Sequence, residues 1–250
     1  MSITIGIPSG TDAIEYLTSF EAALTDYPEM RAALLGIKDS LRQALLLIGE
    51  PLGLLACLTA EEEAASFLYY CLIAKGYSVP KYGKIQRHND KLKLLVFAVV
   101  MQKYFFTLPA ELEGTIRIER DGQKPKTSFV FTHGNHTIVQ EDFLETIVTQ
   151  GEGEDGHDHA VRFAVDDVLK HITPTGFTIG AHITKMANRR NFCLYGDPEK
   201  KQRLRSALEI DHFRANCVCM IVLGFLVSNS GSLTTSMIKL VAIIFDKISS

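Results

Sequence analysis

Apolar residues recur every three or four positions through most of the first 76 residues, which is the period of an α-helix. The pattern predicts helices over 11–27, 28–49 and 51–76. Pro28 and Pro51 fit the first turns of the second and third helices, where the missing N–H of proline is tolerated. Because the connections are short, we expect the three helices to pack as antiparallel neighbours.

The period changes in the middle of the chain. A fourth helix is expected over 88–106, but apolar and polar residues then alternate over 115–132, on either side of the turn-forming pair Asp121-Gly122. The fold class expected is therefore mainly α, a multi-helix bundle with a small β-hairpin insertion around residues 114–140.

The remaining segments complete a single helical domain over residues 1–250, with a β-containing insertion at 110–158. The further elements expected are a short strand at 137–139, a mobile glycine-rich loop over 151–159, and helices over 161–171, 179–189, 198–227 and 233–248.

The net charge and the cysteine content limit the classes of protein to which the chain could belong. The net charge is −3 and the isoelectric point is near 6.2, which excludes a surface built throughout to grip nucleic acid, so any such site must be a local basic patch. The five cysteines form no CxxC pair, which favours buried thiols in a reducing compartment. No basic and apolar leader begins the chain, so a cytoplasmic protein is expected.

Residues 215–238 contain no charged side chain, and their core, 217–227, is almost wholly apolar. That core is about half of the roughly 20 residues that span a bilayer. We therefore expect a buried helical hairpin and no stable membrane insertion, with membrane association as the alternative.

Glu61, Glu62 and Glu63 interrupt the apolar stripe of the third helix. Steps of three and four residues from Leu54 and Leu58 lead to Glu61, and Glu62 lies beside it, so these two carboxylates should face other helices while Glu63 faces solvent. A buried carboxylate needs a cation or a hydrogen-bond donor opposite it. The pair is either an acid/base or ligand-holding site, or an interhelical ion pair that fixes packing.

A polar cluster from Arg87 to Lys91 begins the fourth helix. Arg87, His88 and Asn89 suit an anion such as phosphate, because arginine offers a bidentate fork and histidine transfers protons near neutral pH. The N-terminus of a helix also favours anions. The alternative is that the cluster only caps and solvates the helix.

A second basic region lies at 185–197, where Arg189 and Arg190 stand among asparagines and aromatic residues, and 200–205 extends it. These residue types favour a local nucleic-acid or phosphate site. The alternative is a set of cations at a helix C-terminus. The basic residues around Arg87 or Arg190 are the expected partners of the buried carboxylates.

Metal and cofactor motifs are missing from the sequence. Histidine pairs occur at His133 and His136 and at His157 and His159, but neither pair has the helical spacing of four that brings two rings to one ion. No GxGxxG, GxxxxGK[ST], GxSxG or HExxH motif is present. No metal and no cofactor is therefore expected.

Three stretches form one further pattern: the apolar segment 44–56 followed by Glu61-Glu62, then His88 with Lys91, then the segment 191–197 with its Leu-Tyr-Gly-Asp element. This succession resembles AbiV-type abortive-infection proteins of the HEPN superfamily, which have an EE motif in paired helices, a later His near a Lys, and an LYxD-like element. The resemblance implies an α-helical, dimeric, phage-defence or toxin-like protein.

Many HEPN proteins carry a ribonuclease signature, an arginine followed after four to six residues by a histidine. Here it occurs as Arg205 to His212, with Ser206 where the family has a polar Asn, Asp or His. The resemblance does not by itself imply catalysis, but one hypothesis built on it is metal-independent attack of a ribose 2′-hydroxyl on the adjacent phosphate. The expected catalytic residues are Glu62, His88, Arg205 and His212, and the expected RNA-binding residues are Arg87, Lys91, Arg189 and Arg190.

Three functions remain open at this point. One is an RNA-acting defence protein, another is a non-enzymatic helical module that binds a protein partner or forms a homodimer, and the third is a helical protein that binds a small ligand or nucleotide. Convergence of the acidic, histidine and arginine residues on one cleft would favour the first.

Overall fold

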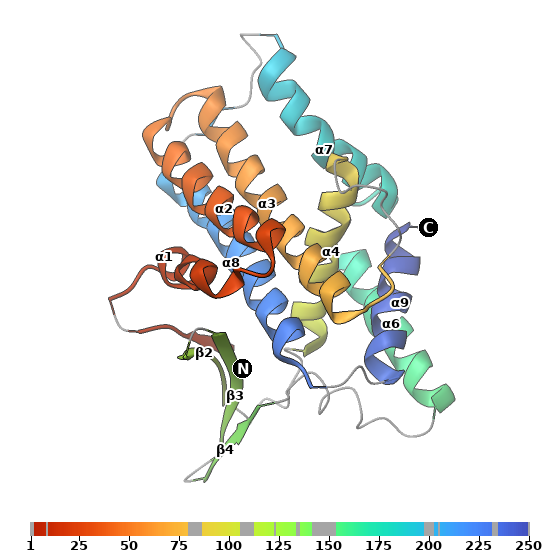
Figure 1. The fold of residues 1–250 in the computed structure, drawn as a ribbon. Coiled ribbons are helices and arrows are strands. Elements are labelled where there is room, and N and C mark those ends of the chain that lie inside the picture. The colour runs from red at the N-terminus through yellow and green to blue at the C-terminus, as the bar shows by residue number, and fades with distance from the viewer. Residues whose placement is uncertain are drawn as a thin grey trace.

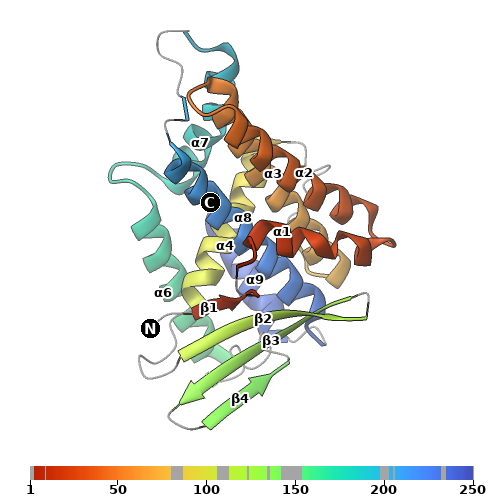
Figure 2. The same ribbon diagram turned by 90° about the vertical axis from the view of Figure 1, so that its left-hand side faces the viewer.

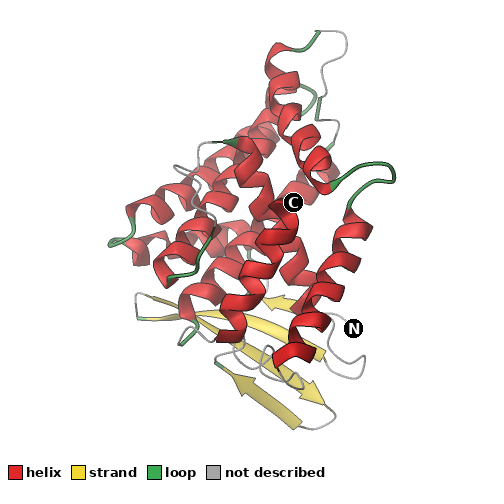
Figure 3. Cartoon of the chain, turned by 90° about the vertical axis from the view of Figure 1, so that its right-hand side faces the viewer, coloured by secondary structure: helices red, strands yellow, loops and turns green. Residues whose placement is uncertain are grey.

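The computed structural model of the chain describes residues 3–8, 10–79, 87–105, 113–122, 124–133, 136–141, 154–197, 203–204, 206–231 and 235–249. Within these ranges, eight α-helices and a 3-10 helix accompany a four-stranded sheet. The helices form the body of the molecule and the strands gather at one end of it (Figures 1 and 3). The mainly α fold with a small β insertion is confirmed.

Helix α3 (Pro51–Lys75) lies at the centre of the fold. It packs against four other helices: α2 (Pro28–Leu46), α4 (His88–Phe105), α7 (Ile179–Tyr195) and α8 (Ala207–Asn229). Because neighbours cover it from several directions, buried side chains surround α3 rather than forming one stripe.

Helix α8 is a core helix. A Cβ at Gly224 would lie 2.6 Å from Cε1 of Phe67, so glycine lets α8 approach α3 closely. The rings of Phe67 and Phe225 meet edge to face, with centroids 5.3 Å apart. Among the described helices α8 alone is long and apolar enough to cross a bilayer, and 61% of its most apolar window is buried inside the fold.

The first expected helix is observed as two pieces, α1 (Ala13–Thr18) and the 3-10 helix η1 (Ser19–Leu24). The carboxylate of Asp12 caps α1 by accepting two backbone N–H groups of the first turn, at 2.9 and 3.1 Å. It also pairs with Arg214, which ties the beginning of α1 to α8.

The sheet has the order β1-β2-β3-β4, with β1 (Ile3–Gly6), β2 (Glu113–Asp121), β3 (Lys124–His133) and β4 (His136–Gln140) (Figure 2). The hairpin of β2 and β3 and the third strand are confirmed, with Gly122 at a φ of 60° in the turn. Buried Ile116, Ile118 and Phe129 lie in the β2–β3 pair, and β3 contacts η1 and α8. The sequence did not predict β1, which pairs parallel to β2.

The loop expected over 151–159 is wrong for its second part, because α6 (Glu154–Ile172) begins at Glu154. Residues 151–153 lie outside the described part of the chain. Once a helix forms over the apolar period that follows, each residue added at its end gains one hydrogen bond. This extension outweighed the loop preference of the glycine and acidic residues.

The long helix expected over 198–227 is observed as α8, which begins at Ala207. Leu204, before it, is not helical, and residues 198–202 lie outside the described ranges. The carbonyl of Leu204 accepts the N–H of Gly49 at 2.8 Å. This bond holds the connection against the turn between α2 and α3. The last helix, α9 (Thr235–Ser249), packs against α4 and α6.

All five cysteines are free, four of them buried and Cys219 half-buried. Burial raises the pKa of Cys57 and of Cys71 to about 12. A thiol that stays protonated is a poor nucleophile, so these side chains act as core residues.

Candidate functional site

Glu61 and Glu62 are both buried on α3, with 6% and 8% of their surface exposed, as the helical spacing predicts. A carboxylate taken out of water costs several kcal/mol unless donors or charges replace its hydration. Side chains from α4, α7 and α8 supply these replacements. The two acids therefore mark the junction of four helices.

Glu62 is shared between a histidine and an arginine. Its Oε1 lies 2.7 Å from Nδ1 of His88 on α4, and its Oε2 accepts a 2.6 Å hydrogen bond from Nη1 of Arg190 on α7. The side chain of Glu62 is 10% exposed, whereas those of His88 and Arg190 are 35% and 28% exposed. The carboxylate thus lies beneath two groups that reach solvent, and the pairing of Glu62 with Arg190 is one of the two that were expected.

The contact with Glu62 sets the direction of the His88 ring. Nδ1 is buried and lies within hydrogen-bond distance of the carboxylate, although the angle of approach is not that of a regular hydrogen bond. The side chain is 35% exposed although Nδ1 is buried, so its exposed surface belongs to other atoms of the side chain. In a neutral ring with its proton on Nδ1, Nε2 carries the lone pair that can accept a proton.

Glu61 is held by a different partner. Its Oε1 accepts a 2.6 Å hydrogen bond from Nδ2 of Asn216 on α8. Burial raises the pKa of Glu61 to about 7, opposed by the Asn216 hydrogen bond and by the charge of Arg189, and the charge of Glu62 raises it further. Glu61 is therefore partly protonated near neutral pH.

Asn216 was not among the predicted residues. It stands at the beginning of the apolar run of α8, where an amide needs a polar partner once buried. The signal that could have identified Asn216 is the position of an amide at the beginning of an uncharged, apolar segment.

Glu63 departs from the expectation that it faces solvent, because its side chain is 32% exposed and has a partner. Its Oε1 lies 3.7 Å from Nζ of Lys91, and its stem packs against α2, where a Cβ at Gly36 would lie 3.1 Å from Cγ of Glu63. The expected RNA-binding residue Lys91 is 13% exposed. Lys91 is thus placed beside the carboxylates, with most of its side chain covered.

A small cavity adjoins the cluster, and its lining consists of Leu58, Glu61, Glu62, Lys91, Leu92, Leu95, Met186, Ala187 and Arg190. Its volume of about 10 Å³ holds about one water molecule. A larger ligand would therefore contact the outer edges of His88 and Arg190 rather than enter between the helices.

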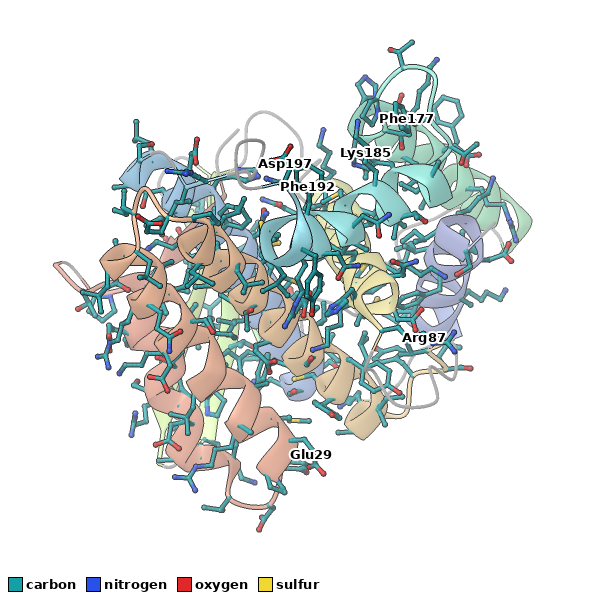
Figure 4. All side chains as sticks on the ribbon, turned by 90° about the horizontal axis from the view of Figure 1, so that it is seen from above. Glu29, Arg87, Phe177, Lys185, Phe192 and Asp197 are labelled. Carbon is teal, nitrogen blue, oxygen red and sulfur yellow. The ribbon has the colours of Figure 1, made fainter. Side chains whose placement is uncertain are left out.

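Arg189, next to Arg190 in sequence, also borders a different surface. It lines an open hollow of about 590 Å³ on the outer side of α7, together with Phe177, Lys185 and Phe192. Figure 4 shows these three labelled side chains along the side of α7 that faces away from α3. Adjacent arginines thus connect the carboxylate cluster with the surface of α7.

The other predicted residues lie elsewhere. Arg87 is exposed before the first turn of α4, and Figure 4 shows it on the opposite side of α7 from Lys185. His212 is exposed on α8, and its described contact is an edge-on approach to the ring of Phe213, with centroids 6.1 Å apart. Arg205 lies outside the described residues, so the spacing from Arg205 to His212 is not placed.

No group of three or more His, Cys, Asp or Glu side chains that could hold a metal ion occurs within the ranges that the structure describes. His133 and His136 are register partners in the β3–β4 ladder, and His157 and His159 belong to α6. The candidate site is therefore the cluster of Glu61 and Glu62 with their partners.

No protein-family model, no curated protein and no solved structure matches this chain. The class of protein is defined by the fold and the site alone. It is a mainly α-helical protein with a small sheet, in which a histidine and an arginine share a buried carboxylate at the junction of several helices.

Proposed function

We propose that this chain is a defence-type protein that cleaves single-stranded RNA without a metal, with His88 as the group that moves the proton. The observation that carries the proposal is the sharing of Glu62 by His88 and Arg190, at 2.7 and 2.6 Å. A base oriented by a carboxylate, next to a guanidinium, is the arrangement that general acid–base attack on a phosphate needs.

The reaction begins with removal of a proton from a ribose 2′-hydroxyl by Nε2 of His88. The 2′-oxygen forms a bond to the adjacent phosphorus, the bond from phosphorus to the 5′-oxygen breaks, and the leaving oxygen takes a proton from water. The products are a 2′,3′-cyclic phosphate and a 5′-hydroxyl. Arg190 donates to Glu62 through Nη1, and in this proposal its remaining N–H groups stabilise the charge that develops on the phosphate.

Cleavage of an end-labelled RNA by the purified protein in the presence of EDTA tests the proposal. His88→Ala should lose at least about 100-fold in rate, because general acid–base catalysis contributes that much. Glu62→Gln should lower kcat more than it raises KM, since the amide no longer favours the Nδ1 proton of His88. Circular dichroism melts establish that each variant folds.

His212→Ala is the matched control, because His212 is exposed on α8 and its described contact is with Phe213. Full activity is expected in this variant. Equal cleavage by the wild type and His88→Ala, or no cleavage by the wild type, would overturn the proposal. Loss of activity in His212→Ala alone would move the reaction to the second histidine.

A second function is favoured by a separate observation, the exposure of leucine side chains at one end of the molecule. Leu46 and Leu208 are 84% and 79% exposed, and Leu52 is 54% exposed. The hydrogen bond from Gly49 to Leu204 brings the beginning of α8 to the α2–α3 turn, so these residues lie at one end of the bundle. Exposed apolar groups that gather in this way favour association.

This second proposal is that the chain forms a homodimer through that end. Light scattering after gel filtration should then give twice the chain mass, and Leu46→Lys with Leu208→Lys should give a monomer. A wild-type monomer at every concentration up to the solubility limit would contradict it.

A further inference from the structure

Helix α7 concentrates positive charge in a chain whose net charge is negative. It contains Lys185, Arg189 and Arg190, and no Asp or Glu between Ile179 and Tyr195. A helix of this composition creates a local positive potential, although the chain as a whole carries −3.

One side of α7 packs against the bundle and the other is exposed. Ile183, Ala187 and Cys193 are buried against the bundle, and Arg190 reaches Glu62. On the opposite side, Lys185, Asn188 and Phe192 succeed one another at steps of three and four residues and therefore share one face.

We call this outer face, with Phe177 and Arg189, the α7 stripe. It borders the hollow of about 590 Å³, and Figure 4 shows Phe177, Lys185 and Phe192 along it. The helical part of the stripe, from Lys185 to Phe192, is about 10 Å long, at a rise of about 1.5 Å per residue.

The stripe combines two kinds of group that rarely stand exposed together. Phe177 and Phe192 are 41% and 45% exposed, and Nζ of Lys185 lies 4.7 Å from the centroid of the Phe177 ring. An exposed aromatic ring offers a stacking platform to a nucleobase, and an ammonium or guanidinium group attracts phosphate. A duplex hides the faces of its bases, so only an unpaired strand can use both kinds of group.

We propose that the α7 stripe is the binding surface for single-stranded nucleic acid, with bases stacked on Phe177 and Phe192 and phosphates held by Lys185 and Arg189. This inference rests on the proposed function and names how its substrate is held. Arg189 borders the stripe while Arg190, the next residue, binds Glu62, so a strand held on the stripe would have to cross α7 at these two arginines to reach the cluster that contains His88.

Binding is best measured on the His88→Ala background, where the proposed reaction does not consume the probe. Fluorescence anisotropy with a labelled single-stranded RNA should show that Phe192→Ala weakens affinity about tenfold, the size of one lost stack. Lys185→Ala should weaken it and lower the slope of log K against log salt by about 0.7, the share of one single-strand phosphate contact.

Two exposed residues outside the hollow are matched controls. Lys126→Ala on the sheet removes the same charge as Lys185→Ala, and Phe163→Ala on α6 removes an aromatic ring that is 71% exposed. Both should leave affinity unchanged. Unchanged affinity in the stripe variants, or equal losses in the controls, would overturn the inference.

Comparing the affinities of different probes identifies the class of ligand that the stripe binds. Tighter binding of single-stranded RNA than of a duplex of equal length supports the inference, and tighter binding of single-stranded DNA than of RNA overturns RNA as the substrate. Equal binding of a polyglutamate peptide would show attraction to negative charge alone and would also overturn it.

The failure of this inference differs from failure of the proposed function. Stripe-dependent binding without cleavage in the wild type removes the reaction and leaves the binding surface. Cleavage that depends on His88 but is unaffected by Phe192→Ala and Lys185→Ala removes the stripe and leaves the reaction.

Discussion

The acidic middle of α3 and the α7 stripe both concentrate charged side chains, but they differ in what surrounds the charge. Glu61 and Glu62 are buried, and their partners come from α4, α7 and α8. The stripe has Lys185 and two phenylalanine rings in contact with solvent on the outside of one helix. Buried charge here joins helices, whereas exposed charge is available to a ligand.

The difference matters because the two regions respond to substitution in different ways. Removing one member of a buried pair leaves the other without hydration or partner, which lowers stability. Removing an exposed cation exchanges it for water, which changes binding and leaves the fold nearly unaffected. The substitutions below are ordered by the size of the effect that this contrast predicts.

Arg190→Ala should have the largest effect on stability, because it leaves the buried carboxylate of Glu62 with His88 as its one remaining described ion-pair partner. Breaking a buried ion pair costs about 3–5 kcal/mol, and the partial exposure of Arg190 places the expected loss near about 3 kcal/mol. Urea unfolding followed by circular dichroism measures it. The double variant Glu62→Met with Arg190→Met should recover much of the loss, and an equal loss in both would contradict buried pairing.

The next largest effect is a dependence of stability on pH that arises from the ionisation of Glu61. Its folded pKa of about 7 lies above its ordinary value of 4.5, so between these values the folded state binds more protons than the unfolded state. The contribution of Glu61 to the free energy of unfolding is therefore fully present below pH 4.5 and is lost as the pH rises through 7.

Compared with Glu61→Gln, whose amide does not titrate, the wild type should lose about 2 kcal/mol between pH 5 and pH 8. Urea unfolding at both pH values gives the difference. A constant gap between the two proteins would show that Glu61 does not hold its proton through burial.

Lys91→Ala should have a smaller effect, because the pair that it forms with Glu63 is 3.7 Å long and Glu63 is 32% exposed. An ion pair of this kind contributes about 1 kcal/mol or less. The same urea titration measures the change. A loss as large as that of Arg190→Ala would mean that Glu63 belongs to the buried group.

Lys185→Ala and Phe192→Ala should change stability least, within about 0.5 kcal/mol, since both side chains face solvent. Thermal melts of the two variants and of the wild type provide the measurement. A substantial loss of stability in either would place the stripe in the core and remove the contrast with α3.

The sequence was most informative where one periodic signal continued over many residues. The helices that begin at Pro28, Pro51 and His88 and the β2–β3 hairpin were predicted because apolar spacing and turn residues agreed there. It was least informative at β1, since four residues are too few to show a period. That strand exists because β2, more than a hundred residues further along the chain, offers it a partner.

The candidate site was predicted in part for the same reason. Helical spacing placed Glu61 and Glu62 inside the bundle, and burial then required partners, for which Arg190 was one expectation. Spacing along one helix contains no information on which residues of α4 and α8 lie opposite. His88 and Asn216 therefore became partners only through the packing of those helices.

By itself, the sequence determined that the chain is mainly helical and that two adjacent carboxylates on α3 are buried, because period and hydrophobicity are local properties. Tertiary structure decided that both expected basic regions reach Glu62, through His88 and Arg190, that Glu63 is half-covered by α2, and that Lys185 and Phe192 remain outside. These outcomes depend on contacts between residues far apart in sequence, and such contacts form only when the helices have packed.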